Sequence, residues 1–395
     1  MNLDFLYGIL NLSFWGYVLV AFLSVQITFM GVTLYLHRDA THRSLDLHPA
    51  LRHFFRFWLW MTSGIVTKEW VAVHRKHHAR CETEEDPHSP VIFGLKKVLL
   101  EGAELYQEQA RNRDTTDKFG RGTPDDWMEH NVYFRHRNLG IVLLAVVDLV
   151  LLGVPGIIVF AVQMLANPVM AAGVINGIGH YYGYRNFECP DAARNIVPWG
   201  LLVAGEELHN NHHAFPSSAK FSIQRWEFDI GWLYITVFKS LGLAKVLRVA
   251  PVPARLAASQ KHVDLETVRA VIVNRMHVLA DYTRHVTLPV FREQVLAAGG
   301  KLSRSVKKLL VREPVLLDNA AKSKLKEVLA NNQALQTVHE FRERLRVLWS
   351  GGNMSNENLL QHLKDWIAQA EASGIKVLQD FAGSLRGYAM QPQAA

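Results

Sequence analysis

Three tight clusters of histidine are the residues of this sequence whose types and spacing could do chemistry. They are His37 and His42 in HRDATH, His74, His77 and His78 in HRKHH, and His209, His212 and His213 in HNNHH. Imidazole nitrogen suits iron, copper, nickel and zinc, whereas magnesium and calcium prefer oxygen ligands. Positions i, i+3 and i+4 share one face of a helix, so each His-x-x-His-His can direct its rings to one metal or divide them between two.

The number of rings indicates the number of metals. Eight imidazoles exceed what one ion binds, so we expect two metals with about four nitrogens each. His37 and His42 are five residues apart and converge only if the helix ends between them. A ninth ring, His180, follows Asn176 by four residues at the end of an apolar run, where an ionisable residue indicates a functional site. Single histidines outside these clusters, such as His88, are interpreted as ordinary packed or surface residues.

The elements that position these rings are predicted to be membrane helices. Residues 14–36 carry no charge and are long enough to cross a bilayer. Two further crossings are predicted at about residues 139–162 and 165–185, with a break near Asn167-Pro168. Because this pair crosses twice, the chain returns to the face of the membrane that it left.

Two less apolar segments complete the expected topology. Residues 51–72 carry charges near both ends, which predicts a partly embedded or interfacial helix. If that segment dips in and returns, all three clusters lie on one face of the membrane. Residues 79–138 are polar and rich in Lys and Arg, which places that face in the cytoplasm by the positive-inside rule. We therefore expect an all-α integral membrane protein, with a membrane-embedded domain over residues 1–250.

Residues 251–395 have a different character. After a linker, PVPARLAAS, amphipathic helices are predicted around residues 262–284, 287–299, 320–348 and 357–386. This part holds 20 Lys and Arg against 13 Asp and Glu, which accounts for the whole net charge of +7. We expect a soluble, cytoplasmic helical tail of unknown role, with its charges on a solvated surface. An anionic lipid surface or an acidic partner is the alternative, and no nucleic-acid partner is expected.

The setting of the histidines indicates a reaction. A nitrogen-rich site of two metals beside lipid predicts oxidation of a lipidic substrate by O₂, with non-haem iron as the metal. The middle carbons of an acyl chain have no functional group, so a narrow apolar tunnel must present one pair of them. Aromatic residues near the clusters, Trp70 and Tyr181 among them, are candidates to line it. Arg75 is a candidate to face a CoA or phospholipid phosphate, with a solvated loop charge as the alternative.

Five motifs resemble the membrane fatty acid desaturase family, in particular the acyl-CoA Δ9 (stearoyl-CoA) desaturases and their bacterial relatives. The motifs are HRDATH, EWVAVHRKHH, EEDPHSP, NGIGHYYGYR and GEELHNNHHAFP, and the resemblance covers about residues 30–230. It implies four transmembrane helices under a cytoplasmic cap, in a bacterial inner membrane. It also implies a di-iron centre that uses O₂ to place a cis double bond, at Δ9, in a saturated chain carried as acyl-CoA or in phospholipid. The implied ligands are His37, His42, His74, His77, His78, His180, His209, His212 and His213, with Asn176 holding a water on one iron.

Electrons for this chemistry must come from a separate protein. The chain has two cysteines, Cys81 and Cys189, and no Cys-x-x-Cys pair, so it cannot carry a four-cysteine iron–sulfur centre. The sequence His48-Pro49-Ala50 departs from the His-Pro-Gly-Gly motif of a fused cytochrome b5. We expect a donor that resembles ferredoxin, ferredoxin reductase or cytochrome b5.

Two other functions compete with desaturation. A di-iron membrane hydroxylase or alkane monooxygenase would do related chemistry, but such enzymes space their motifs as His-x3-His and His-x3-His-His. A histidine-rich metal transporter would place its ligands at mid-membrane on broken helices. Here the clusters lie at or beyond the ends of the apolar segments, which favours the desaturase.

Overall fold

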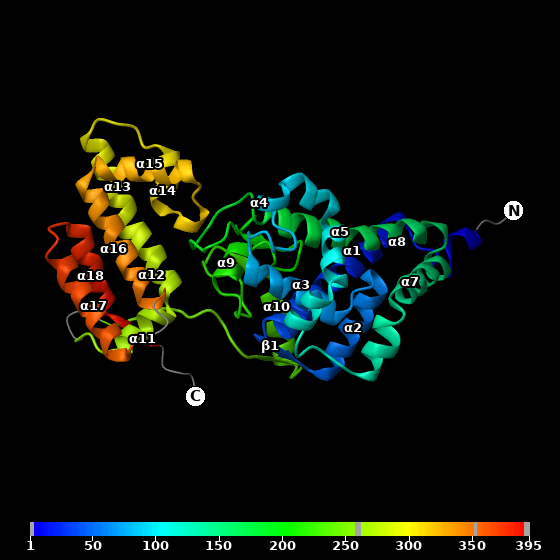
Figure 1. Ribbon diagram of the computed structural model, residues 1–395. Helices are drawn as coiled ribbons and strands as arrows, with labels where there is room; N and C mark the ends of the chain where they lie inside the picture. Colours follow the sequence, from blue (N-terminus) through cyan, green and yellow to red (C-terminus); the bar gives the residue numbers. More distant parts are fainter. Residues whose placement is uncertain (1–3, 257–261, 351–353, 391–395) are drawn as a thin grey trace. The chain divides into compact units, whose positions relative to one another are not determined.

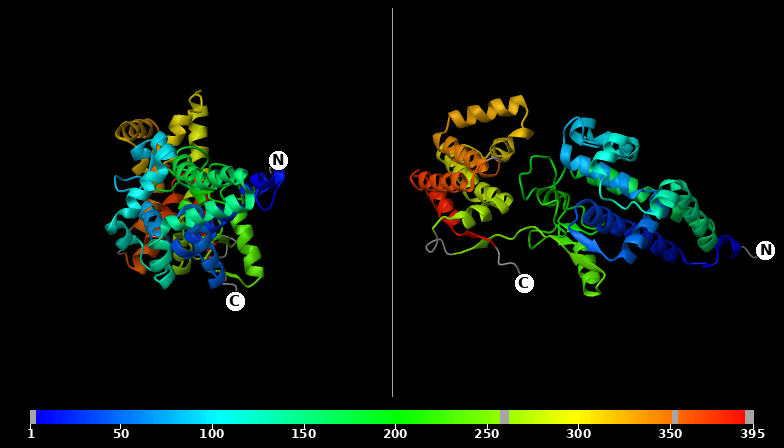
Figure 2. Two further views of the ribbon diagram at one scale, coloured as in Figure 1. Left: turned by 90° about the vertical axis from the view of Figure 1, so that its right-hand side faces the viewer. Right: turned by 60° about the horizontal axis from the view of Figure 1, so that its bottom comes forward.

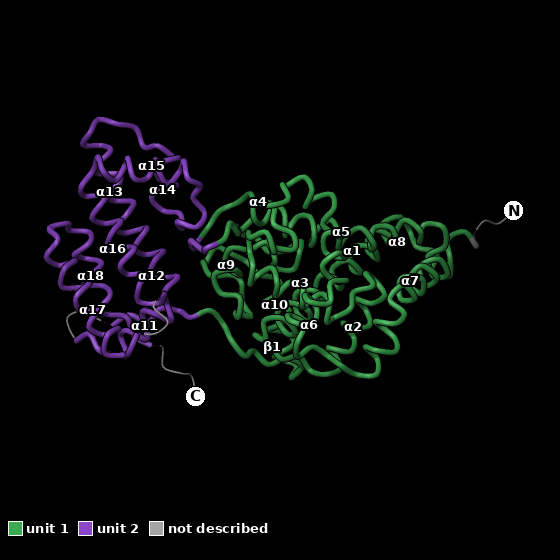
Figure 3. The backbone as a smooth tube through the Cα atoms, viewed as in Figure 1, with its two compact units in different colours: residues 1–185, 191–250 green, residues 186–190, 251–395 purple. Residues whose placement is uncertain are grey.

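The computed structural model describes residues 4–256, 262–350 and 354–390, and most of its regular structure is helical (Figure 1). The chain divides into two compact units (Figure 3). Unit 1 contains residues 1–185 and 191–250, and unit 2 contains residues 186–190 and 251–395. All three histidine clusters belong to unit 1.

The first long helix carries the first cluster. Helix α1 (Phe14–Met30) begins at Ser13, whose hydroxyl accepts a hydrogen bond from the Gly16 amide, and it continues directly into the π-helix η2 (Gly31–Thr41). The helix ends at Thr41, between His37 and His42 as expected, and the His42 amide donates to the His37 carbonyl at 3.0 Å. This i→i+5 turn is wider than an α-helical one and brings the two rings to the same side.

The apolar hairpin breaks at a different residue from the one predicted. Helix α7 (Arg137–Leu152) ends at Gly153, and α8 (Val154–Ala166) continues into the π-helix η4 (Asn167–Ile178) across Pro168. Gly153 has φ 69° and ψ −148°, a conformation that needs glycine. A Cβ there would lie 2.1 Å from the Leu6 carbonyl oxygen. The predicted break at Asn167-Pro168 was wrong because the wider turns of η4 accommodate the missing amide hydrogen of proline.

Among the described residues, two helices are long and apolar enough to cross a membrane. They are Phe14–Thr41, of 28 residues, and Val154–Ile178, of 25 residues. Helix α7 has only 16 residues before Gly153, too few to count as a third. The four transmembrane helices of the family pattern are therefore not confirmed.

The predicted interfacial segment forms two helices. Helix α2 (Pro49–Ser63) ends at Gly64, which is left-handed with φ 63°, and α3 (Thr67–Arg80) follows. Helix α2 buries Phe55 and Leu59 and exposes Phe54 and Phe57. Its buried face packs on η2 and α7, so α3 starts beside the end of the first long helix.

Short elements close unit 1 around the histidines. The polar segment contains helices α4 (Pro90–Phe93), α5 (Leu95–Arg111), α6 (Arg113–Phe119) and the π-helix η3 (Glu129–Phe134). Helix α5 packs along η4. Strand β1 (Leu45–Leu47) pairs with β4 (Ala244–Val246), and β2 (Trp199–Gly200) pairs with β3 (Phe228–Asp229). Between these strands lie α9 (His209–Ala214), which carries the third cluster, and α10 (Ile230–Ser240).

Unit 2 is helical, as expected for the tail (Figures 1 and 2). Trp366 and Tyr282 are fully buried in its core. The Trp366 indole donates a hydrogen bond to the Phe341 carbonyl at 2.8 Å. The Tyr282 hydroxyl donates one to the Val338 carbonyl at 2.7 Å. Strand β5 (Ala254–Arg255) pairs with β6 (Tyr388–Ala389). The helices are α11 (Leu265–Val273), α12 (Arg275–Tyr282), η6 (Thr283–Thr287), α13 (Leu288–Ala297), α14 (Arg304–Val311), α15 (Asn319–Ala330), α16 (Gln333–Ser350), α17 (Asn356–Glu371) and α18 (Lys376–Arg386). Helix α14 lies outside the predicted segments.

Candidate metal centre

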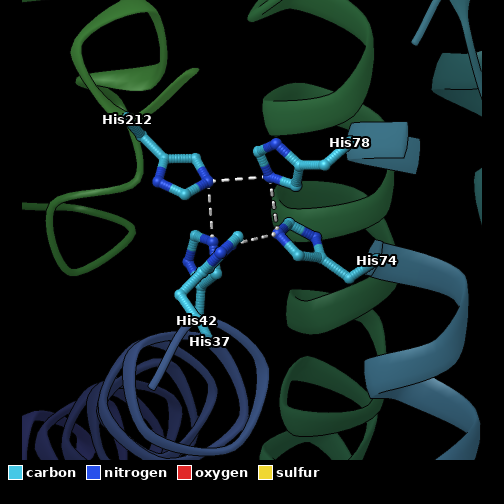
Figure 4. A group of neighbouring side chains, drawn as sticks. All are labelled: His37, His42, His74, His78 and His212. Carbon is cyan, nitrogen blue, oxygen red and sulfur yellow. Dashed lines mark hydrogen bonds between the residues drawn. The ribbon is translucent and has the colours of Figure 1, made fainter. Parts of the chain in front are cut away.

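Five histidine rings from three distant elements converge on one point (Figure 4). They are His37 and His42 at the end of η2, His74 and His78 on α3, and His212 on α9. Their Nε2 atoms form a chain of short contacts. The separations are 3.0 Å for His37 and His212, 2.9 Å for His212 and His78, 3.0 Å for His78 and His74, and 3.2 Å for His74 and His42.

These distances suit a cation held by imidazole nitrogen. Two nitrogens bound at about 2.1 Å and at a right angle lie about 3.0 Å apart. Burial lowers the pKa of His42, His74, His78 and His212 well below the usual value, and the neighbouring rings lower it further. Rings that stay neutral keep nitrogen lone pairs, which repel one another unless a cation lies between them. The five-ring cluster therefore fits a transition metal with nitrogen ligands.

The remaining four rings form a second cluster next to the first. The ligand atoms of His77, His180 and His213 lie within 4.8 Å of one another. The Nε2 atom of His209 lies 3.0 Å from that of His180. These four rings come from three parts of the chain. His77 is on α3, His180 follows η4, and His209 and His213 lie on α9. All nine sequence-predicted histidines thus fall into neighbouring groups of five and four.

Four buried carboxylates orient these rings, and sequence reasoning did not include them among the site residues. Each accepts a hydrogen bond from the Nδ1 atom of one histidine, so that its Nε2 faces the cluster. The pairs are Glu206 with His37 at 2.8 Å, Asp86 with His77 at 2.9 Å, Glu82 with His180 at 3.2 Å, and Asp191 with His213 at 3.1 Å. Carboxylate partners of this kind set the tautomer and the direction of a metal-binding imidazole.

The charges of these pairs support that arrangement. Burial alone would lower the pKa of His77, but the charge of Asp86 and their hydrogen bond raise it. Burial alone would raise the pKa of Asp86 and of Glu206, but their histidine partners lower both. Asp86 and Glu206 are therefore ionised acceptors, and the rings of His77 and His37 donate to them from Nδ1. Asp86 stands in the quoted EEDPHSP motif, and Glu206 lies three residues before His209, signals that could have identified them.

His88 also lies at this centre, although a lone histidine was interpreted as ordinary. Its ring stacks on His77 with centroids 4.4 Å apart, and its buried Nδ1 has no partner among the described residues. Burial and the neighbouring His77 lower the pKa of His88 to about 3. The quoted EEDPHSP motif contains His88 and could have identified it, and its neighbours in space make it part of the site.

A cavity of about 460 Å³ reaches the histidines from one side. Its walls come from η2, α3, α5, α7 and η4, and they include Val32, Trp70, Val73, Ala103 and Ile175. His37, His74, His88 and His209 also line it. A long apolar molecule in this cavity would lie directly against the metal-binding rings.

The structure places the other predicted site residues as follows. Trp70 lines the cavity and stacks on His74, with ring centroids 4.9 Å apart and planes at 11°. Asn176 lines the same cavity, from η4. Arg75 donates to the backbone carbonyls of Ala40, Thr41, Phe119 and Arg121, and Tyr181 is 64% exposed; neither is among the cavity-lining residues. The roles of Trp70, Arg75 and Tyr181 toward a substrate, and that of Asn176 toward a metal-bound water, stay predictions.

The comparisons with known proteins agree with this geometry. The family model for fatty acid desaturases matches residues 13–229, more than half of the chain. The chain belongs to the fatty acid desaturase family. It is 29% identical to the delta-9 acyl-lipid desaturase 2 of Arabidopsis thaliana, over 60% of this chain and 76% of that protein. It is 31% identical to an sn-1 stearoyl-lipid 9-desaturase of Synechocystis, over 60% of this chain and 73% of that protein.

Another relative carries a different substrate in its name. The chain is 31% identical to an acyl-CoA 5-desaturase of Anemone leveillei, over 55% of this chain and 67% of that protein. Together these findings show that this desaturase is an oxidoreductase that acts in fatty acid desaturation and associates with membranes. Its histidine clusters can bind metal.

The tail has a separate likeness. A family model described as a transposase matches residues 263–391, which is 129 of the 395 residues of the chain. This match covers most of unit 2 but too little of the chain to assign it to that family. The expectation that the protein has no nucleic-acid partner stays a prediction.

Proposed function

We propose that this desaturase is an O₂-dependent di-iron enzyme that introduces a cis double bond, at Δ9, into a saturated acyl chain. The observation that carries the proposal is that two neighbouring histidine clusters have rings at the wall of one cavity, which is lined in large part by apolar side chains. A centre beside such a cavity can act on carbon atoms that have no functional group, because the cavity walls choose which carbons approach.

The two clusters supply the ligands for two irons. His37, His42, His74, His78 and His212 would hold one iron, and His77, His180, His209 and His213 would hold the other, where Asn176 would position a water. When bound, iron would activate O₂ for a balanced reaction in which O₂, two electrons and two protons convert –CH₂–CH₂– to –CH=CH–, and O₂ leaves as two waters. The chain's own contribution is to orient the rings through Glu82, Asp86, Asp191 and Glu206.

The substrate and the electron donor follow from the setting of the site. The acyl chain enters as acyl-CoA or as part of a phospholipid, since the names of the relatives include both kinds of substrate. A separate ferredoxin-like, ferredoxin-reductase-like or cytochrome b5-like protein delivers the electrons, and the excess of Lys and Arg after residue 250 suits an acidic donor. The enzyme lies in a bacterial inner membrane with its metal centre facing the cytoplasm.

Expression in a host without its own desaturase tests the proposal. Gas chromatography with mass spectrometry of the acyl-CoA and phospholipid pools, sampled over time, should show a Δ9 cis product that appears first in the pool that carries the substrate. The purified protein should contain about two irons and consume O₂ only with an electron donor.

Three outcomes would reject parts of this proposal. A hydroxylated product would assign the chain to di-iron hydroxylation instead. Metal uptake into vesicles without O₂ consumption would assign it to transport. A double bond at another position would keep desaturation and remove Δ9.

A further inference from the structure

The second cluster contains a side chain of a different chemical kind. Cys81 follows His77 by four residues and ends α3, so the two lie on the same face, one turn apart. The Sγ atom of Cys81 lies 3.9 Å from Nε2 of His77. The ligand atoms of His77, Cys81, His180 and His213 all lie within 4.8 Å of one another. The five-ring cluster includes no sulfur.

An independent observation indicates that the same group of side chains suits a cation. His213 has a side chain only 2% exposed, and its Nδ1 donates to Asp191. Its buried Nε2 atom has no hydrogen-bond partner among the described residues. A buried nitrogen acceptor without a partner is costly. A cation in the second cluster would satisfy it.

The distances suit a sulfur ligand. A thiolate binds at about 2.3 Å and an imidazole nitrogen at about 2.1 Å, which separates the two atoms by about 3.6 Å at a tetrahedral angle and about 4.4 Å when they are opposite. The observed 3.9 Å lies between these values. A thiol that binds a metal loses its proton and becomes the thiolate ligand.

We infer that Cys81 is a metal ligand, which makes the two metal positions chemically different. The inference rests on the proposed function, because it needs metal in both clusters. A thiolate is softer than imidazole and favours zinc more strongly. We therefore expect zinc to replace iron more readily at the position that contains Cys81 than at the five-ring position, where all the ligands are imidazoles.

Cobalt substitution of the purified full-length protein tests this assignment. Cobalt(II) bound by thiolate has a charge-transfer band in the near ultraviolet that cobalt bound only by imidazole lacks. The protein reconstituted with two cobalt ions should show the band, and Cys81→Ser should lose it. Cys189→Ser is the matched control, because it removes the only other cysteine of the chain and should keep the band.

Thiol alkylation of the unmodified protein gives a second measurement that does not depend on folding of a variant. Cys81 is partly exposed, so it should react in the metal-free protein. Metal should slow this reaction at least about tenfold, since the bound thiolate is no longer free to act as a nucleophile.

The outcomes separate the two proposals. Two bound cobalt ions without the band, or equal alkylation with and without metal, would overturn the role of Cys81 alone. Failure to bind any cobalt would overturn the metal centre and the role of Cys81 together. Persistence of the band in Cys81→Ser would likewise overturn the assignment.

Discussion

The Nε2 atoms of His37 and His212 lie 3.0 Å apart, although 175 positions separate these residues along the chain. One ring stands at the end of the first long helix, and the other stands on the short helix α9. The contact joins the first and third histidine clusters in one group. The two rings can bind the same metal only when unit 1 is folded, because folding alone brings these segments together.

Removal of His212 should therefore abolish desaturation. The His212→Ala variant loses one nitrogen from the five-ring cluster and leaves His37 and His78 without the ring nitrogen that lies closest to each. We expect the amount of product to fall at least about 100-fold and the iron content to fall. Loss of a partner that only orients a ligand costs about 10- to 100-fold in activity, and loss of the ligand itself should cost more. Whole-cell fatty acid analysis and metal analysis measure the two effects.

The control for this variant is His130→Ala. His130 pairs with Asp125 on the surface, and its side chain is 62% exposed. It should keep full activity and iron content. Normal product from His212→Ala at normal expression would contradict the five-ring centre.

Glu206→Gln should weaken the metal centre without removing a ligand. Glu206 accepts from His37 Nδ1 at 2.8 Å and from the Thr33 hydroxyl at 2.6 Å. Glutamine is neutral and no longer holds the His37 ring in one tautomer. We expect metal affinity to fall about 10- to 100-fold, measured by competition with a chelator. Glu85→Gln, at a side chain that is 63% exposed, should change nothing, and an equal loss in both variants would contradict the orienting role.

The cavity predicts a variant that loses substrate but keeps metal. Ala103 on α5 lines the cavity of about 460 Å³, so Ala103→Trp should place an indole ring in the path of the acyl chain. Turnover should fall strongly while the protein retains about two irons, because the ligands are untouched. Leu100→Trp lies on the same helix, at a position 70% exposed, and should keep its activity. Equal turnover in both variants would place the acyl chain elsewhere.

A buried ion pair beside the first cluster should control stability. Arg38 and Asp229 both have fully buried side chains, with Nη2 and Oδ1 3.0 Å apart. Arg38→Leu leaves the carboxylate buried without its cation, so we expect a loss of about 3 to 5 kcal/mol. Denaturant unfolding in detergent micelles, followed by tryptophan fluorescence, measures this change.

An exposed pair provides the comparison. Lys68 and Asp117 have side chains that are 46% and 73% exposed. Lys68→Met should cost about 0 to 1 kcal/mol, because solvent screens the pair. A similar free energy of unfolding for the Arg38 and Lys68 variants would show that Arg38 does not stabilise unit 1.

Much of the secondary structure could be predicted from sequence patterns, and the failures have physical causes. Apolar runs identified α1 and α8, and periodicity identified most helices of unit 2, because both signals are local. The break at Gly153 was missed since Asn167-Pro168 is the stronger turn signal, whereas the close approach of Leu6 to Gly153 is a tertiary contact. The i→i+5 turn between His37 and His42 was missed for the same reason, because no local pattern distinguishes it from an α-helical end.

The sequence by itself determined which side chains could bind metal and that there are enough of them for two ions. The tertiary structure alone decided how they divide. Adjacent residues point about 100° apart on a helix, so His77 joins the rings of His180 and His213 while its neighbour His78 joins that of His212. Which rings lie opposite each face depends on where α9 and the end of η4 pack. The same packing brings Glu206 to His37 and places Cys81 beside His180 and His213. Spacing along the chain does not predict these contacts, because the partners lie far apart in the sequence.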